Sequence, residues 1–146
     1  MTRNQPNLKE TFECVARIGV SGEDHMGEAF AAAMLPSMNG PGGCNEGFLR
    51  DDALLMVTFI GGYDYDSKGT PGSWAASVLK AKGGDPEAVV MFSILDPECP
   101  PYDRVCELVE QFPHHLIVDG YLDDYVAPFM EATSLVDEAC AEFIPQ

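Results

Sequence analysis

Apolar residues in this chain form short unbroken runs separated by helix-spaced patterns, and this arrangement predicts a sheet flanked by helices. The run from Ala53 to Ile60 is apolar at every position except Thr58, with no period-2 alternation. Such a run is typical of a strand covered on both faces, as in parallel α/β sheets. Two later runs, Ala88 to Leu95 and Leu116 to Val118, predict a second buried strand and a third, shorter strand.

Helical patterns follow each of these runs. We predict helices over Ser73 to Lys82, over about Tyr102 to Phe112, and over a last segment that Asp123 or Asp124 caps. Right-handed crossovers then place the three strands parallel to one another in a single sheet. The residues expected to face inward from these helices are Trp74, Val78, Leu79, Val105, Leu108, Val109, Phe129, Ala132, Leu135, Val136, Ala139 and Phe143.

The first part of the chain contains no predicted strand. Leu8 to Ile18 predicts a short helix ended by Gly19, and a second helix is expected between Ser21 and Pro36. Asn39 to Gly47 is a loop by its composition. The predicted fold class is therefore α/β: a single Rossmann-like domain over residues 1–146, in three layers, with about three parallel strands. Because doubly wound sheets usually have five or six strands, we expect this sheet to be incomplete.

Charge limits the partners that this chain can have. Its formal net charge is −16, from 24 Asp and Glu residues against eight Lys and Arg residues. This charge argues against nucleic acid, whose binding depends on Lys and Arg contacts to phosphate, and it disfavours anionic membrane surfaces. An acidic surface of this kind is either simply solvated or binds cations. We also expect no membrane span, because no apolar run is long enough to cross a bilayer, and the first ten residues lack the pattern of a signal peptide.

The chain has five cysteines, and all are disulfide candidates: Cys14, Cys44, Cys99, Cys106 and Cys140. Two disulfides would leave one thiol unpaired, and the sequence leaves the pairing open. No Cys-x-x-Cys pair occurs, which argues against a zinc knuckle or a thioredoxin-like site. Cys99 precedes a predicted helix, where a thiolate is stabilised, so it is either a reactive thiol or a disulfide or inert cysteine.

The acidic loop after the first predicted strand resembles the start of a calcium-binding loop. Asp64 and Asp66 stand at its first and third positions, and Gly69 stands at the sixth. The pattern then departs from an EF-hand, because Lys68 and Ala75 occupy positions where oxygen ligands belong. The loop is either a looser calcium site or a solvated acidic turn.

Two other groups of polar residues have alternative interpretations. His114 and His115 are adjacent at the start of a strand, so they point to opposite faces and cannot share a metal ion from that strand. We expect structural or surface roles for both. Asp119, Asp123 and Asp124 either join the acidic loop in a cation site or only cap the last helix.

Four segments together resemble a known family. NEGFLRDDALLMVTFI, LKAKGGDPEAVVMFSI and SLVDEACAEF resemble the von Willebrand factor type A domains of secreted, often lipid-anchored bacterial surface proteins, in particular those of the myxobacterial kind. TFECVARIGVSGEDHMGEAFAAAM is similar to the segment that these domains place before their fourth strand. The resemblance covers nearly the whole chain but only the second half of the family's domain.

The resemblance implies the fold and a degenerate form of the family's metal-ion-dependent adhesion site. The family's Asp-x-Ser-x-Ser triplet does not occur here, and the position of its later aspartate falls on Gly62. Ser21 lies in the region that matches the family's threonine ligand. With Asp64 and Asp66 of the acidic loop, Ser21 completes the set of candidate ligands of a divalent cation, Ca²⁺ or Mg²⁺.

The resemblance implies a non-catalytic binding or adhesion module of an exported bacterial protein, located outside the cell or in its envelope. We expect a protein ligand at the carboxyl edge of the sheet, and a homodimer formed through the exposed central strand, Ala53 to Ile60. One alternative is a small α/β hydrolase or thiol redox enzyme that uses Cys99 or the acidic loop. The other is a truncated domain with no independent function.

Overall fold

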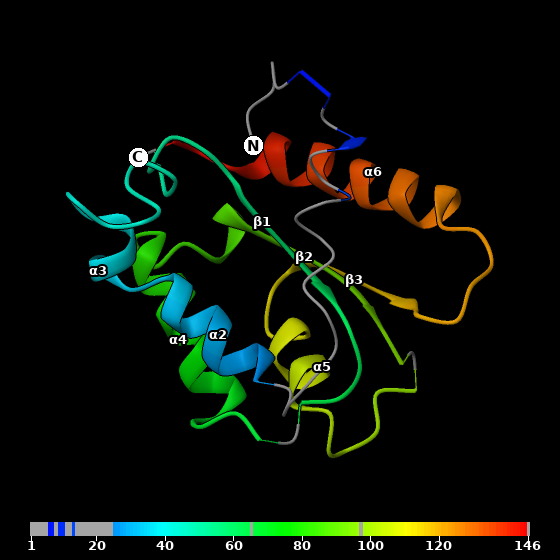
Figure 1. The fold of residues 1–146 in the computed structure, drawn as a ribbon. Helices are drawn as coiled ribbons and strands as arrows, with labels where there is room; N and C mark the ends of the chain where they lie inside the picture. The colour runs from blue at the N-terminus through cyan, green and yellow to red at the C-terminus, as the bar shows by residue number, and fades with distance from the viewer. Residues whose placement is uncertain are drawn as a thin grey trace.

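A three-stranded parallel sheet forms the centre of the protein (Figure 1). The computed structural model describes residues 6, 7, 9, 10, 13, 25–64, 66–96 and 98–145. The strands are β1 (Leu55–Ile60), β2 (Val89–Leu95) and β3 (His114–Asp119), in the spatial order β1-β2-β3. These features confirm the predicted α/β class and the open, Rossmann-like parallel layout.

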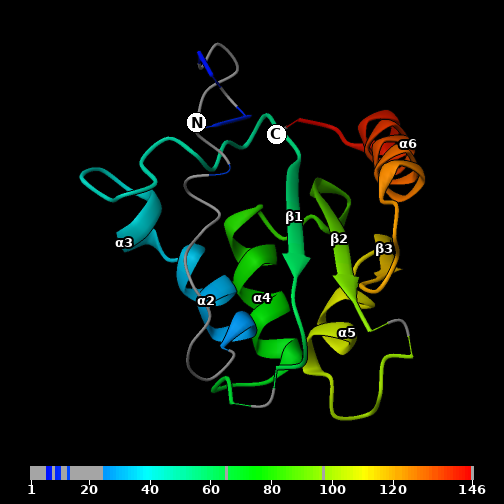
Figure 2. The same ribbon diagram turned by 45° about the vertical axis from the view of Figure 1, so that its right-hand side comes forward.

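Helices cover both faces of the sheet, but unequally. They are α2 (Met26–Ala33), α3 (Pro36–Asn39), α4 (Pro71–Ala81), α5 (Arg104–Val109) and α6 (Val126–Glu142), with a 3-10 turn, η1 (Pro86–Ala88), before β2. Because the strand order is sequential and the crossovers have one hand, α4 and α5 lie on the same face, where α2 joins them (Figure 2). Among the described helices, α6 is the one that covers the opposite face.

The hydrophobic core is divided between these two faces. The larger part lies under α2, α4 and α5 and includes Trp74, Val78 and Leu108, three of the predicted inward residues. The smaller part lies under α6 and joins Phe92 of β2 to Ala132 of α6. Since β2 contributes side chains to both parts, every one of its residues is buried.

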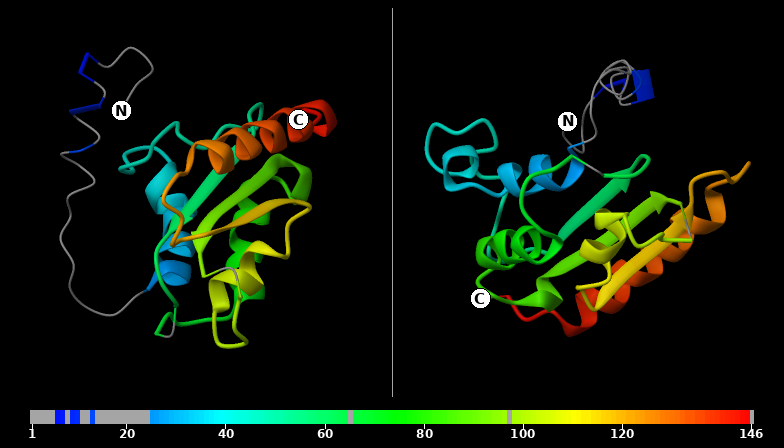
Figure 3. Two further views of the ribbon diagram at one scale, coloured as in Figure 1. Left: turned by 90° about the vertical axis from the view of Figure 1, so that its right-hand side faces the viewer. Right: turned by 90° about the horizontal axis from the view of Figure 1, so that it is seen from below.

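The prediction that β1 is covered on both faces is wrong. Leu55 and Phe59 are each 7% exposed, but Met56 and Ile60 on the other face are 42% and 66% exposed. The reason is the position of α6, which packs against β2 and β3 and leaves that face of β1 open (Figure 3). In the described part of the chain, β1 is an edge strand, and β2 is the strand whose faces are both covered.

Several boundaries also differ from the predicted ones. The helix expected to end at Pro36 does end just before it, at Ala33, but Pro36 also begins the short helix α3, because its fixed φ suits the first helical position. The predicted helix over Tyr102 to Phe112 is shorter in the structure, since Asp103 caps it. The predicted helix over Leu8 to Ile18 lies mostly outside the described residues.

Candidate functional site

The acidic loop after β1 caps the start of helix α2. Asp64 is fully buried, and its Oδ2 accepts hydrogen bonds from the backbone N–H of Gly27 at 2.7 Å and from Ser67 Oγ at 2.7 Å. Its Oδ1 accepts from the backbone N–H of Ser67 at 3.1 Å. The Ser67 hydroxyl in turn accepts from the backbone N–H of Glu28 at 3.0 Å. Helix amino termini leave N–H groups without intrahelical partners, and this loop supplies acceptors for two of them.

Side chains from two helices hold the same loop. The Arg104 guanidinium donates hydrogen bonds to the carbonyls of Ser67, at 2.6 Å, and Gly69, and it stacks on the Trp74 ring at 4.6 Å from the centroid. Trp74 Nε1 donates to the carbonyl of Lys68 at 2.9 Å. Three successive carbonyls of the loop are therefore engaged by side chains, and the path of the loop is fixed by contacts within the protein.

The candidate cation ligands do not share one environment. Asp64 is buried in the hydrogen bonds described above, Asp66 is exposed, and Ser21 lies outside the described residues. Asp119 accepts a hydrogen bond from the backbone N–H of Tyr121, and Asp124 accepts one from Val126 at the start of α6. The cation site at this loop remains a prediction.

A tyrosine and an aspartate are paired across the carboxyl ends of β1 and β2. The Tyr63 hydroxyl donates a hydrogen bond to Asp96, which also accepts from the backbone N–H of Glu98. The hydrogen bond to Asp96, with partial burial and the negative charge beside it, raises the pKa of Tyr63 far above its usual range. The same hydrogen bond lowers the pKa of Asp96. At neutral pH the phenol is therefore protonated and the carboxylate ionised.

An open groove of about 630 Å³ lies beside this pair, at the carboxyl edge of all three strands. Aromatic and aliphatic side chains form most of its wall, with one carboxylate. The lining residues are Ile60, Gly61, Gly62, Tyr63, Ile94, Leu95, Asp96, Gly120, Tyr121, Tyr125 and Phe129. Parallel α/β sheets bind their ligands at this edge, so the groove is the best candidate binding site of the described chain.

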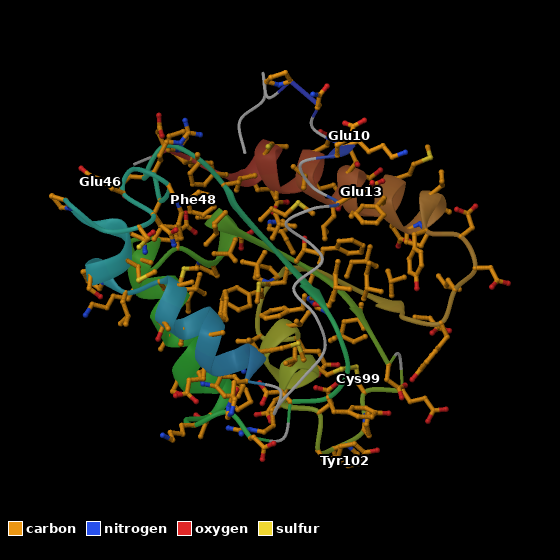
Figure 4. The ribbon with its side chains drawn as sticks, in the orientation of Figure 1. Glu10, Glu13, Glu46, Phe48, Cys99 and Tyr102 are labelled. Atoms are coloured by element: carbon orange, nitrogen blue, oxygen red, sulfur yellow. A yellow bond between two sulfur atoms is a disulfide. The ribbon has the colours of Figure 1, made fainter. Side chains whose placement is uncertain are left out.

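The cysteines divide into a disulfide and free thiols. Cys99, in the loop between β2 and α5 (Figure 4), forms a disulfide with Cys106 of α5. Cys44 and Cys140 are exposed free thiols, and Cys14 lies outside the described residues. A disulfide sulfur is not a nucleophile, so a hydrolase that used Cys99 would first need this bond to be reduced.

Asp103, the N-cap residue of α5, makes the stability of the fold depend on pH. Burial raises the pKa of Asp103, the charges of Asp64 and Asp96 raise it further, and hydrogen bonds from the backbone N–H groups of Val105 and Cys106 oppose the rise. The folded state therefore disfavours the ionised carboxylate of Asp103. As a result, the free energy of unfolding falls as pH rises from the usual pKa of an aspartate to the raised pKa of Asp103.

We expect Asp103→Asn to keep the cap, because asparagine caps helices as well as aspartate does, and to remove this charge penalty. The free energy of unfolding should rise relative to wild type by up to about 1 kcal/mol at pH 7, with a smaller difference at pH 4. Urea titrations at both pH values measure it. A variant whose difference from wild type grows toward pH 4 would contradict the assignment.

A second polar cluster lies at the opposite, amino edge of the sheet. It joins His114 at the start of β3 to Glu87 of η1 and Glu142 at the end of α6. The sequence interpretation did not find it, because no motif spacing links three residues so far apart in the chain. A signal was available only in retrospect: Glu87 lies just before the amino end of β2, and His114 begins the neighbouring strand β3.

The fold and the groove define the class of protein: an α/β domain with an open three-stranded parallel sheet and an apolar binding groove at its carboxyl edge. Comparison of the chain with protein families, with curated proteins and with solved structures finds no match in any of the three. Among the described residues, no helix combines the length and apolar character that a bilayer crossing requires.

Proposed function

We propose that this domain is a non-catalytic module that binds a protein through the carboxyl-edge groove. The observation that carries the proposal is the exposure of large apolar side chains there: Tyr121 is 82%, Ile60 66% and Phe129 48% exposed. A second shallow hollow, lined by Val126, Phe129 and Met130 among others, continues the apolar surface along α6. Contiguous exposed apolar surface marks interaction sites, and tyrosine is enriched where proteins bind each other.

The chemistry of the groove supports binding rather than catalysis. None of its described lining residues is a serine, threonine, cysteine, histidine or lysine. The Tyr63 hydroxyl is committed to Asp96, and its raised pKa keeps it protonated, so it is a poor nucleophile or base. Nucleophilic catalysis needs a nucleophile and a base within hydrogen-bond reach of each other, and in this groove the carboxylate is already paired with one of the three phenols.

An exported parent protein is part of the same proposal. The Cys99–Cys106 disulfide supports it, because disulfides persist in oxidising compartments. The resemblance to von Willebrand factor type A domains supports an adhesion role outside the cell or in its envelope. The open side of β1, with Met56 and Ile60 exposed, supports pairing with a second copy of the chain.

The groove is tested by selecting displayed random peptides with the folded domain as bait. We expect the selected peptides to share an aromatic or large aliphatic residue, because such a side chain fills an apolar groove. Tyr121→Ser and Ile60→Ser should each weaken binding of a selected peptide at least about tenfold, as truncation of an interface anchor does. Calorimetry with the purified peptide measures the dissociation constant.

The matched control is Ile144→Ser, which truncates an isoleucine that is 77% exposed and lies outside the groove. It should leave the dissociation constant unchanged. Equal affinity of all three variants for every selected peptide would overturn the proposal. Sedimentation of the same samples at micromolar concentration tests the homodimer. A stable monomer contradicts the homodimer, and the proposal that the groove binds a protein then depends on the peptide result.

A further inference from the structure

A buried histidine lies between two carboxylates at the amino edge of the sheet, on the side away from the groove. His114 is the first residue of β3, Glu87 lies in η1 just before β2, and Glu142 is the last residue of α6. The register of the parallel strands brings the first two together, since His114 pairs with Val90, the second residue of β2. The end of α6 packs against η1 and adds the third.

The ligand atoms of these side chains converge on a small volume. His114 Nε2 lies 2.7 Å from Glu87 Oε2 and 3.5 Å from Glu142 Oε2. All three ligand atoms lie within 4.8 Å of one another. In a tetrahedral zinc site with bonds near 2.0 to 2.1 Å, ligand atoms are about 3.3 Å apart. Small side-chain rotations would therefore bring this cluster to the spacing of a metal site.

Two of these atoms are buried, and their contact at 2.7 Å is that of an ion pair without hydrogen-bond geometry. The His114 side chain is 9% exposed, and its Nε2 and the Oε2 of Glu87 approach each other without meeting the geometry of a hydrogen bond. Buried polar atoms are normally satisfied, because an unsatisfied one costs about 1 to 3 kcal/mol. A cation placed between the two atoms and Glu142 would satisfy both.

We propose that Glu87, His114 and Glu142 bind a zinc ion. An imidazole nitrogen with two carboxylate oxygens suits Zn²⁺ better than Ca²⁺ or Mg²⁺, which prefer oxygen ligands alone. Three protein ligands leave a fourth position for water. Glu142 is 64% exposed and Glu87 39% exposed, so the ion has a path from solvent. The bound ion would tie the end of α6 to the sheet.

Zinc titration by calorimetry tests the site, in a Cys14→Ser/Cys44→Ser/Cys140→Ser background that removes every cysteine other than the disulfide pair. We expect one zinc ion per chain, saturating at micromolar concentration, and a higher melting temperature with zinc. Glu142→Gln and His114→Gln should each weaken binding about tenfold or more, the effect that loss of even a supporting group has on metal affinity.

Two neighbouring substitutions serve as controls. Glu138→Gln changes an exposed carboxylate one turn earlier on α6, and His115→Gln changes the adjacent, exposed histidine. Both should leave zinc affinity unchanged. If His114→Gln fails to fold, Glu142→Gln decides, because its side chain is mostly exposed. Two results would overturn the proposal: no saturable zinc binding by the cysteine-substituted protein, or a Glu142→Gln variant that binds zinc as tightly as that protein does. Either result would mean that His114 forms only ion pairs with the two glutamates.

Discussion

Asp64→Ala is expected to lower the free energy of unfolding by at least about 3 kcal/mol, because Asp64 accepts three hydrogen bonds and each hydrogen bond to a charged group contributes about 1.5 to 3 kcal/mol. The substitution leaves the N–H of Gly27 without its acceptor at the start of α2 and removes a negative charge from a helix amino terminus. Urea unfolding followed by circular dichroism measures the change.

The control lies two residues away. Asp66→Ala removes an exposed carboxylate from the same loop, and its effect should stay within about 0.5 kcal/mol, as for most surface substitutions. The two substitutions together also distinguish two roles of the loop, helix capping and calcium binding. Equal, small effects of both substitutions without added cation would refute the capping role and return the loop to its interpretation as a calcium site.

Gly27→Ala is expected to destabilise the protein by about 2 kcal/mol, in the range for overpacked cores. A Cβ atom at this position would lie 2.4 to 2.5 Å from three ring atoms of Trp74. That ring is 2% exposed, bonded through Nε1 to the carbonyl of Lys68 and stacked under Arg104, so it has no room to move. The single tryptophan also reports the change, through its fluorescence during urea unfolding.

Gly72→Ala is the matched control, since both glycines occupy the second position of a helix. At Gly72 the nearest atom to an added Cβ is Gln111 Oε1 at 3.8 Å, an ordinary contact. Alanine is favoured over glycine in a helix by about 1 kcal/mol, so Gly72→Ala should be neutral or stabilising. A stabilising Gly27→Ala would show that the contact between α2 and Trp74 is not as tight as described.

The α/β class follows from local patterns in the sequence. The unbroken apolar run around Val89 to Leu95 and the helix-spaced residues Trp74 and Val78 predict elements that the structure contains, within a few residues. They succeed because a strand buried on both faces and a helix with one buried face each require a particular spacing of apolar side chains. The kinship with von Willebrand factor type A domains remains a proposal.

Interactions between distant residues were beyond the reach of these patterns. The loop at Asp64 has the local composition of a cation site, but its carboxylate caps a helix 37 residues earlier in the chain. The apolar run of β1 matches that of a central strand, yet one of its faces is open because α6 packs elsewhere. The sequence contained no sign of either partner.

By itself, then, the sequence determined which segments become strands and helices, since periodicity and capping act over a few residues. Only the tertiary structure decided which faces are covered, what Asp64 bonds to, and that His114 lies between Glu87 and Glu142. Those outcomes depend on how separate elements pack, and residues brought together by packing need share no spacing along the chain.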